Sequence, residues 1–203
     1  VDTAVGLQLR DSIVLLREKL CHLIGVCADV AERERDTVML GRTHGQAAVP
    51  ITFGLKAAVW LDELRRQLIR LDEASPRIAV GKFLGAVGTG AAQGEHAREL
   101  QRLILTHLGL GVHLDTSQVV GRDRYVEYIS WLANVATTCE KVLQEIRNLQ
   151  RSELAEAGEG FDVKKLVGSS TMAHKKNPIK SENASGLARI VRSFIIPTYE
   201  NAL

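Results

Sequence analysis

The sequence predicts an all-α fold in which long helices pack into a bundle. Of its 203 residues, 45% are hydrophobic and 25% are charged, but only 4% are aromatic. Residues that favour helices, such as alanine, leucine, arginine and glutamate, are abundant. Apolar residues recur at three- and four-residue spacing over long stretches, as they do along one face of a helix. A chain of this length can also bury a core of its own.

The first helix is expected from about Thr3 to Asp36, and at this length it would span about 45 Å. Its apolar positions almost encircle the helix axis. They include Leu7, Leu9, Ile13, Val14, Leu15, Leu16, Leu20, Leu23, Ile24, Cys27 and Val30. A helix that is apolar on several sides needs partners on several sides, which a multi-subunit bundle would supply.

Three more helices are expected between Thr52 and Glu153, and no strand is expected in the chain. One runs roughly from Thr52 to Glu73 and is ended by Ser75-Pro76. A shorter one spans about Glu95 to Leu108, with Gly109 as its C-terminal stop. A long one covers roughly Asp123 to Glu153. Because a hydrolase of the Ser-His-Asp type would need a serine elbow after a strand, that class of enzyme is not favoured.

Residues 81 to 94 are unusually rich in glycine. A phosphate-binding loop would need the Walker order of glycines followed by Lys-Ser/Thr, which is absent here. We therefore expect the glycines to permit a close backbone approach, either of helix to helix or of the chain to a ligand. They are Gly81, Gly85, Gly88, Gly90 and Gly94.

Charge and cysteine content restrict the classes of function. The formal net charge is only +2, so no overall field favours nucleic acid or a membrane surface. The cysteines are three in number and form no Cys-x-x-Cys pair, which predicts free thiols in a reducing cytoplasm and no zinc site. The chain begins with Val1 and ends within a helical pattern, so we expect it to be a piece of a longer protein.

One stretch, from Gly168 to Asn183, gathers unusual chemistry. Pro178 suits the first position of a helix and Asn177 is a good N-cap, so a helix is expected to start here. Its free N–H groups, with Lys175 just upstream, predict an anion site. An ordinary capped helix preceded by solvated basic residues would give the same sequence pattern. The hydroxyls and histidine that precede it, Ser169, Ser170 and His174, exceed what a cap needs.

Two other stretches offer polar groups for a ligand. Arg42, Thr43 and His44 follow one another between two helices and can donate several hydrogen bonds to a carboxylate-rich ligand, although a lone loop histidine is usually just solvated. Gln118 precedes the long fourth helix, where it either faces a ligand or belongs to an ordinary helix start. A polar loop over residues 157–177 is long for a compact domain, and such loops are often lids.

The same stretches resemble a known family. The run Gly-Ser-Ser-Thr-Met-Ala-His-Lys-Lys-Asn-Pro from Gly168 is similar to the signature loop of the fumarase/aspartase superfamily. Gly-Arg-Thr-His-Gly-Gln from Gly41 and Gln-Val-Val-Gly-Arg-Asp-Arg from Gln118 resemble its adenylosuccinate lyase branch. The sequence departs from the family pattern at two places, with Ala173 in place of proline and Leu84 in place of serine.

The resemblance implies a β-elimination that releases fumarate from adenylosuccinate and from the succinylated aminoimidazole carboxamide ribotide of purine biosynthesis, without metal or organic cofactor. It implies that Ser169 is the base and that His44 donates a proton to the leaving nitrogen. Lys175 and Asn177 would hold the developing aci-carboxylate. The remaining substrate-binding residues would be Thr43, Gln118 and Ser170.

The resemblance also implies an architecture. Residues 1–203 would be the central helical domain of a cytoplasmic homotetramer that acts on a small nucleotide, with active sites shared between subunits and with 157–177 as a mobile signature loop. This piece alone is expected to be inactive. Two alternatives stay open, another superfamily member (a 3-carboxymuconate cycloisomerase-like enzyme or an argininosuccinate lyase) and a non-catalytic helical scaffold. Gly45 and the Gln118 segment favour the adenylosuccinate branch, and intact Ser169, Lys175, Asn177 and His44 favour catalysis.

Overall fold

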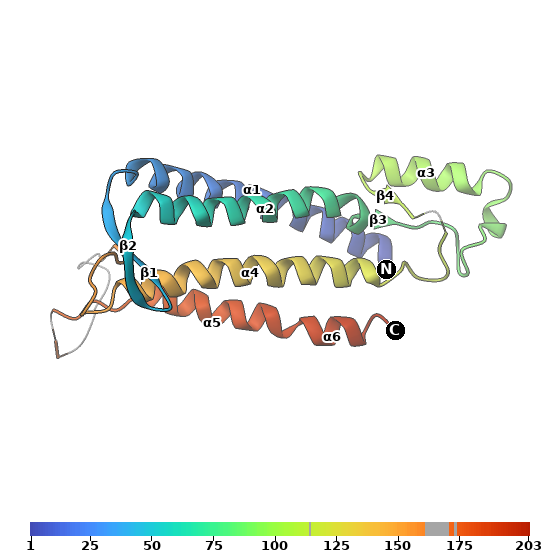
Figure 1. Ribbon diagram of the computed structural model, residues 1–203. Helices are drawn as coiled ribbons and strands as arrows, with labels where there is room; N and C mark the ends of the chain where they lie inside the picture. The colour runs from blue at the N-terminus through green and yellow to red at the C-terminus, as the bar shows by residue number, and fades with distance from the viewer. Residues whose placement is uncertain (114, 161–170, 173) are drawn as a thin grey trace.

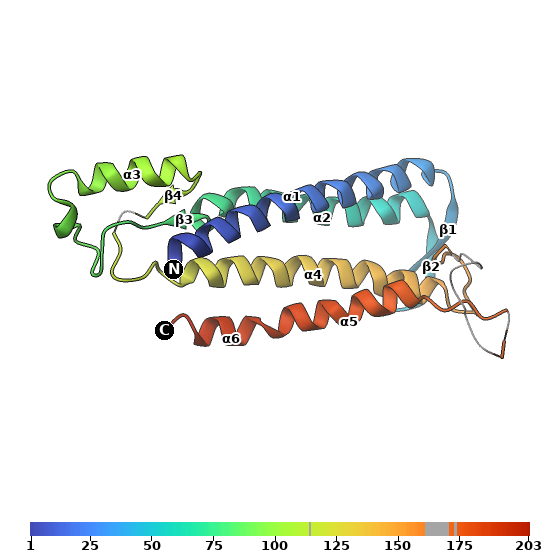
Figure 2. The same cartoon turned by 180° about the vertical axis from the view of Figure 1, so that it is seen from behind.

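Long helices lie side by side along one axis and give the molecule its elongated shape (Figures 1 and 2). The computed structural model describes residues 1–113, 115–160, 171–172 and 174–203. The long helices are α1 (Asp2–Arg33), α2 (Phe53–Ile78), α4 (Asp123–Leu149) and α5 (Ile179–Ser193), which the short α6 (Ile195–Glu200) continues. Neighbours in sequence run in opposite directions, α2 packs against α1 and α4, and α5 packs against α4. The prediction of an all-α long-helix bundle is confirmed.

The core lies between α1, α2 and α4. In α1 the buried apolar side chains recur every seven residues, which is the narrow seam of a helix that packs along a partner. The core residues are Ile13, Leu20, Cys27, Leu64, Leu71, Ala74, Ile78, Tyr128 and Trp131. Other apolar positions of α1 remain at the surface, with Val14 63% exposed and Leu15 53% exposed.

The segment between α1 and α2 forms a β-hairpin, so the expectation of a strand-free chain is wrong. Strands β1 (Val38–Thr43) and β2 (Gln46–Thr52) pair in antiparallel register. The two turn residues, His44 and Gly45, both have left-handed backbone conformations, with φ of 54° and 74°. A two-residue turn of this kind matches the twist of paired strands, which explains why a segment that reads as a loop forms a hairpin.

A small subdomain lies at the other end of the bundle. The short strands β3 (Val80–Gly81) and β4 (Gly111–Val112) pair in parallel, and between them come the 3₁₀ turn η1 (Ala91–Gln93) and helix α3 (Ala97–His107). Gly109, with φ of 66°, follows α3, which confirms the predicted helix stop. The chain therefore passes through this subdomain before α4 returns along the bundle (Figure 1).

Two helix ends differ from the sequence prediction. Helix α2 continues through Pro76 to Ile78, where the predicted end was Ser75-Pro76. A proline near a helix end removes only its own N–H bond, and here Arg77 donates through Nη1 to the Glu73 carbonyl at 2.8 Å. Helix α4 ends at Leu149 and not near Glu153, because the following residues turn back on the helix.

Candidate functional site

The predicted site residues lie at opposite ends of the bundle. Thr43 and His44 form the hairpin tip, and Lys175 and Asn177 precede α5, all at the end where α4 finishes. Gln118 lies just before α4 begins. The 27 residues of α4 separate these two ends, and at 1.5 Å per residue that is about 40 Å. Within one chain, therefore, Gln118 and His44 do not belong to one site.

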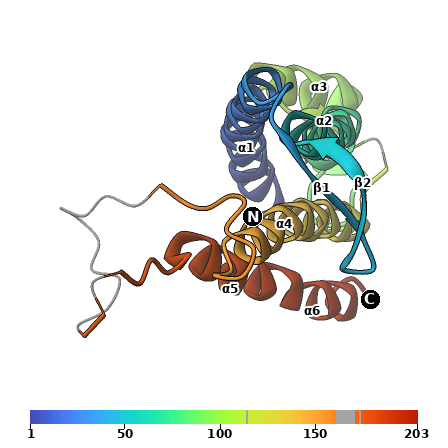
Figure 3. The same cartoon turned by 60° about the vertical axis from the view of Figure 1, so that its left-hand side comes forward.

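The hairpin carries His44 outward in an uncommon backbone conformation. Its φ of 54° lies in the left-handed region, which costs an L-residue such as histidine roughly 1–2 kcal/mol. The side chain is exposed, and the hairpin lies across the end of the bundle from the α1 and α2 side toward α4 (Figure 3). Strain of this kind in a surface turn is a reason to look for a function there.

Two ion pairs link the hairpin and the start of α2 to the end of α4 and the segment that follows it. Arg42 donates to both carboxylate oxygens of Glu156 at 2.7 and 2.6 Å, and Lys56 donates to Glu145 at 2.5 Å. The Arg42 guanidinium lowers the pKa of Glu156, mainly through these hydrogen bonds. Arg42 therefore holds the strand that carries Thr43 and His44 and is not free to bind a ligand.

A separate set of hydrogen bonds holds the segments on either side of the signature loop. Gln150 donates through Nε2 to the Lys176 carbonyl at 3.0 Å, and its Oε1 accepts from the Glu159 N–H at 2.9 Å. The Glu159 carboxylate accepts from the N–H groups of Lys180 at 3.2 Å and Ser181 at 2.6 Å. Burial raises the pKa of Glu159, but these hydrogen bonds outweigh that effect, and the net pKa is lowered.

The start of α5 therefore differs from the prediction in two ways. The helix begins at Ile179 with Pro178 at the N-cap position, one residue later than an Asn177 cap would place it. The N–H groups that were expected to bind an external anion are used by the carboxylate of Glu159. An anionic ligand near this helix would accordingly depend on side chains and not on the helix end.

Such side chains line a cavity of about 800 Å³ between the end of α4 and the residues before α5. Arg151, Lys175 and Lys176 all contribute to its wall, and in the described part of the chain none of the three lies within ion-pair distance of a carboxylate. The other lining residues include Gln144, Arg147, Asn148, Gln150, Glu159, His174, Asn177 and Glu182. Among the described residues of this wall, these three cations have no carboxylate partner, which suits a multiply charged anion.

Sequence reasoning missed Arg151. It also lines the neighbouring cavity, together with Arg42 and Gly45 of the hairpin, so it lies between the hairpin tip and the Lys175 segment. In the sequence it is one more basic residue after a helical pattern, where positive charge is favoured anyway by the helix dipole. In the structure, Arg151 is distinguished from other basic residues because it lines both cavities.

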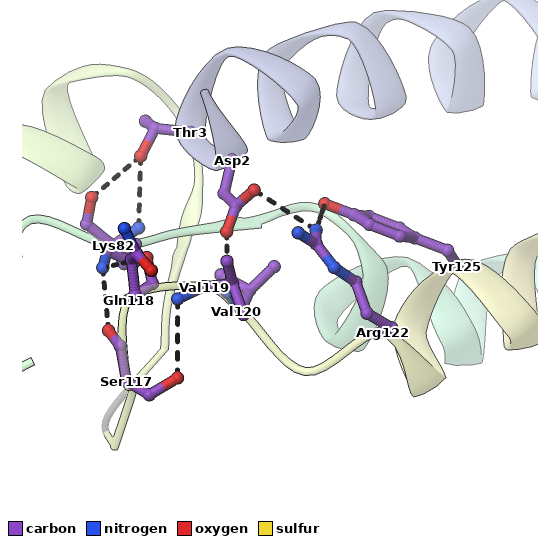
Figure 4. Close-up of polar contacts among 9 residues, drawn as sticks. All are labelled: Asp2, Thr3, Lys82, Ser117, Gln118, Val119, Val120, Arg122 and Tyr125. Carbon is purple, nitrogen blue, oxygen red and sulfur yellow. Dashed lines mark hydrogen bonds and ion pairs between the residues drawn. The ribbon is translucent and has the colours of Figure 1, made fainter. Parts of the chain in front are cut away.

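The opposite end presents Gln118 from a tightly bonded backbone (Figure 4). Asp2, whose side chain is only 8% exposed, accepts from the Val120 N–H at 2.8 Å and from Arg122 Nη1 at 3.2 Å. Arg122 in turn lies 5.3 Å from the centre of the Tyr125 ring, within cation–π range. A cavity of about 520 Å³ is lined here by Val1, Asp2, Thr3, Lys82, Gln118, Val119 and Arg122.

The glycine-rich segment packs directly against the Gln118 segment. A Cβ on Gly88, whose φ is 80°, would lie 1.6 Å from the Thr116 carbonyl oxygen, so only glycine fits there. A close backbone approach is therefore present here, but it joins two loop segments and not two helices. Leu84, which replaces the family's serine, is 2% exposed. Its side chain is therefore part of the core and offers no hydrogen bond to the cavity.

Comparison with known proteins identifies the family. Residues 1–193 match the sequence profile of the family described as Lyase. The chain belongs to this lyase family. It is 52% identical over 201 residues to the adenylosuccinate lyase of Methanothermobacter thermautotrophicus, covering 99% of this chain and 45% of that protein. It is 48% identical to that of Archaeoglobus fulgidus, covering 100% of this chain and 46% of that protein. The chain thus spans less than half the length of these relatives.

Two solved structures share the fold. A fumarate lyase from Mesorhizobium sp. BNC1 is 36% identical with a TM-score of 0.81, covering 96% of this chain and 42% of that chain. The 3-carboxy-cis,cis-muconate lactonizing enzyme from Pseudomonas putida is 34% identical with a TM-score of 0.89, covering 99% of this chain and 44% of that chain. The resemblance to the fumarase/aspartase superfamily is thereby confirmed.

The structure brings together only some of the predicted site residues. Lys175 and Asn177 line one cavity, and the hairpin tip with Thr43 and His44 lies at the same end of the bundle. Gln118 lies at the other end. Ser169 and Ser170 lie outside the described residues. None of the helices in the described part of the chain is long and apolar enough to cross a membrane.

Proposed function

We propose that the protein containing this chain is a C–N lyase that eliminates fumarate from adenylosuccinate, giving AMP, and from the succinylated aminoimidazole carboxamide ribotide. The observation that supports this most strongly is its 44–52% identity, over nearly the whole chain, to archaeal adenylosuccinate lyases. The cavity that carries Lys175 and Asn177 agrees with it, because its unpaired cations suit the two carboxylates of a succinyl group.

In this proposal the residues keep the roles that the family resemblance gives them. A C–H next to a carboxylate is a weak acid, so its removal needs a strong base and a site that stabilises the resulting dianion. Ser169 is the base, and Lys175 and Asn177 hold the aci-carboxylate. His44 gives a proton to the leaving nitrogen. Thr43, Gln118 and Ser170 bind and position the substrate, and no metal or organic cofactor takes part.

The proposal requires several copies of the chain, and we propose a cytoplasmic homotetramer with shared active sites. The separation of Gln118 from His44 by the length of α4 supports this, because a site that uses both must join ends of different copies. The exposed apolar side chains of α1, such as Val14 and Leu15, offer a surface for the contact. The ligand is a small nucleotide, and neither nucleic acid nor a membrane is a partner.

The test is fumarate release by the full-length gene product, followed by ultraviolet absorbance. Adenylosuccinate and argininosuccinate are offered separately in this assay. Because a lactonizing enzyme shares the fold, 3-carboxy-cis,cis-muconate is offered as well, and its lactonisation, which releases no fumarate, is followed by the loss of its diene absorbance. We expect turnover of adenylosuccinate alone and at least a 100-fold loss in Ser169→Ala, since a positioned base contributes about 10²–10⁴-fold. Turnover of another substrate, or none in a folded oligomer, would contradict the proposal. Residues 1–203 alone are expected to release no fumarate.

A further inference from the structure

We propose that Lys82 is a positioning residue that fixes the backbone presenting Gln118 to the substrate; this rests on the proposed function. The Lys82 ammonium donates to the carbonyl of Ser117 at 2.8 Å and to that of Gln118 (Figure 4). It also donates to the carbonyl of Gly85 at 3.1 Å. An ammonium has three N–H donors, and here each has a backbone acceptor. Lys82 therefore has no donor left for a ligand, and its influence on a substrate passes through the backbone that it holds.

The acceptors of Lys82 set it apart from other lysines of the chain. Lys56 pairs with Glu145 and Lys141 with Glu63, whereas Lys82 meets only carbonyl oxygens and lies within ion-pair distance of no described carboxylate. Three carbonyl oxygens that converge on one point repel one another unless a cation lies between them. The conformation of the Ser117–Gln118 backbone therefore depends on the ammonium itself.

The other contacts of this segment fix its two ends, and a long hydrogen bond from the Val119 N–H to Ser117 Oγ, at 3.5 Å, spans Gln118 (Figure 4). Asp2 holds the Val120 N–H, and the Thr116 carbonyl lies against Gly88. Between these fixed points the Lys82 ammonium binds the two intervening carbonyls. The Gln118 side chain is exposed and lines the adjoining cavity, so the backbone conformation sets the direction of its Cα–Cβ bond and with it the space that the amide can reach.

Lys82 is itself anchored to the bundle. The Thr3 hydroxyl donates to the Lys82 carbonyl at 2.8 Å and accepts from the Lys82 N–H at 3.2 Å. A continuous set of hydrogen bonds thus runs from the first turn of α1 through Lys82 to Gln118 (Figure 4). A misplacement of about 1 Å can cost an enzyme about 100-fold in rate, so the loss of this anchor has a measurable effect.

The test is a double-mutant cycle in the full-length gene product. Lys82→Met keeps the length of the side chain but removes its donors. We expect it to lower kcat/KM for adenylosuccinate by about 10- to 100-fold, mainly through KM. Because Lys82 acts through Gln118, the double variant with Gln118→Ala should lose no more than about threefold beyond Gln118→Ala alone. If the losses of the two single variants multiply in the double variant, or if Lys82→Met leaves KM unchanged, the proposal is overturned.

Two further variants distinguish a positioning role of Lys82 from an effect of its charge alone and from a general loss of stability. Lys82→Arg keeps the charge but replaces the compact ammonium by a planar fork, so we expect less than a tenth of the lost kcat/KM to return. Full recovery would mean that charge alone suffices and would overturn the proposal. Lys141→Met, which removes a lysine paired with Glu63 far along α4, should leave kcat/KM within about twofold.

A substrate-free readout keeps this inference separable from the proposed function. Amide hydrogen exchange over residues 117–120 should be at least about tenfold faster in Lys82→Met than in the unsubstituted protein. Unchanged exchange would overturn the positioning role whatever the reaction is. If the unsubstituted protein releases no fumarate but exchange accelerates in Lys82→Met, the proposed substrate is wrong and the structural role of Lys82 stands.

Discussion

The two ends of the bundle present their polar groups in different ways. At the hairpin end, His44 projects from a strained surface turn, and Arg151, Lys175 and Lys176 have no described carboxylate partner. At the other end, Gln118 is surrounded by bonded groups, and the charges of Asp2, Lys82 and Arg122 are all used within the chain. The hairpin end therefore carries cations without a described ion pair, whereas the end near Gln118 is held by hydrogen bonds within the chain.

This difference fits a site built between copies. Arg151, Lys175 and Lys176 are exposed and have no described carboxylate partner, so they are available to an arriving anion. A group that only has to be presented, such as the Gln118 amide, gains most from a rigid backbone. If the ends of different copies meet, each site combines the reactive end of one with the rigid end of another.

The largest effect is expected at the hairpin tip. His44→Asn removes the ionisable ring but suits a left-handed turn residue followed by glycine. We expect fumarate release to fall by at least about 100-fold, while the unfolding temperature is unchanged or slightly higher. His107→Asn in the last turn of α3 is the matched control and should keep full activity. A destabilised His44→Asn protein would show that the histidine serves the turn and not the chemistry.

At the other end the expected effect is on stability. Asp2→Asn leaves the Val120 N–H and Arg122 with a weaker acceptor in a buried place, which should cost about 1–3 kcal/mol of unfolding free energy. Urea unfolding of the full-length protein measures it, with the exposed Asp11→Asn as control. Equal stability of the two variants would mean that this end is not the rigid framework described above.

A smaller and local effect is expected for the pair that holds the hairpin. Glu156→Gln removes the charge that Arg42 binds, so the hairpin should open more often. Amide exchange over residues 38–52 should be faster, with little change in the exchange of α2 or α4. Glu153→Gln, a neighbouring glutamate without a described ion pair, is the control. If both variants exchange alike, Arg42 does not secure the hairpin.

The smallest effect is expected in the pH dependence of stability. The pKa of Glu159 is lower in the folded chain than its ordinary value near 4.3. Its stabilising contribution is therefore complete above that ordinary value and is lost as the pH falls through the folded pKa. The Glu159→Gln variant should melt lower at pH 7, and the difference from the unsubstituted protein should shrink below about pH 4. A difference that is constant with pH would exclude an ionised cap.

The bundle could be predicted from the sequence because α1, α2 and α4 repeat their apolar residues at helical spacing over many turns. The hairpin could not, because five of the seven residues of β2 are exposed and no alternation of apolar and polar residues marks its strands. The cap of α5 was misassigned because the local Asn-Pro signal competes with a carboxylate about twenty residues earlier, Glu159, which only the folded chain brings near.

The site was predictable in its residues but not in its arrangement. Motif resemblance named His44, Gln118, Lys175 and Asn177, and the predicted helix over residues 123–153 already separates Gln118 from Lys175 and Asn177. The sequence does not state at which end of that helix His44 lies, because this depends on how the helices pack. Arg151 and Lys82 escaped notice for the same reason. Arg151 is distinguished by lining two neighbouring cavities. Lys82 is distinguished by its hydrogen bonds to the carbonyls of Gly85, Ser117 and Gln118, which are far apart in the sequence.

The most direct test of the central claim is complementation between the two ends. Full-length His44→Asn and Gln118→Ala variants are prepared separately and then co-expressed, and fumarate release from adenylosuccinate is measured. If each site takes His44 and Gln118 from different copies, random mixing restores both residues in about a quarter of the sites. Activity should then rise to about a quarter of the unsubstituted level. Activity that stays at the level of the separate variants would contradict a site shared between the two ends.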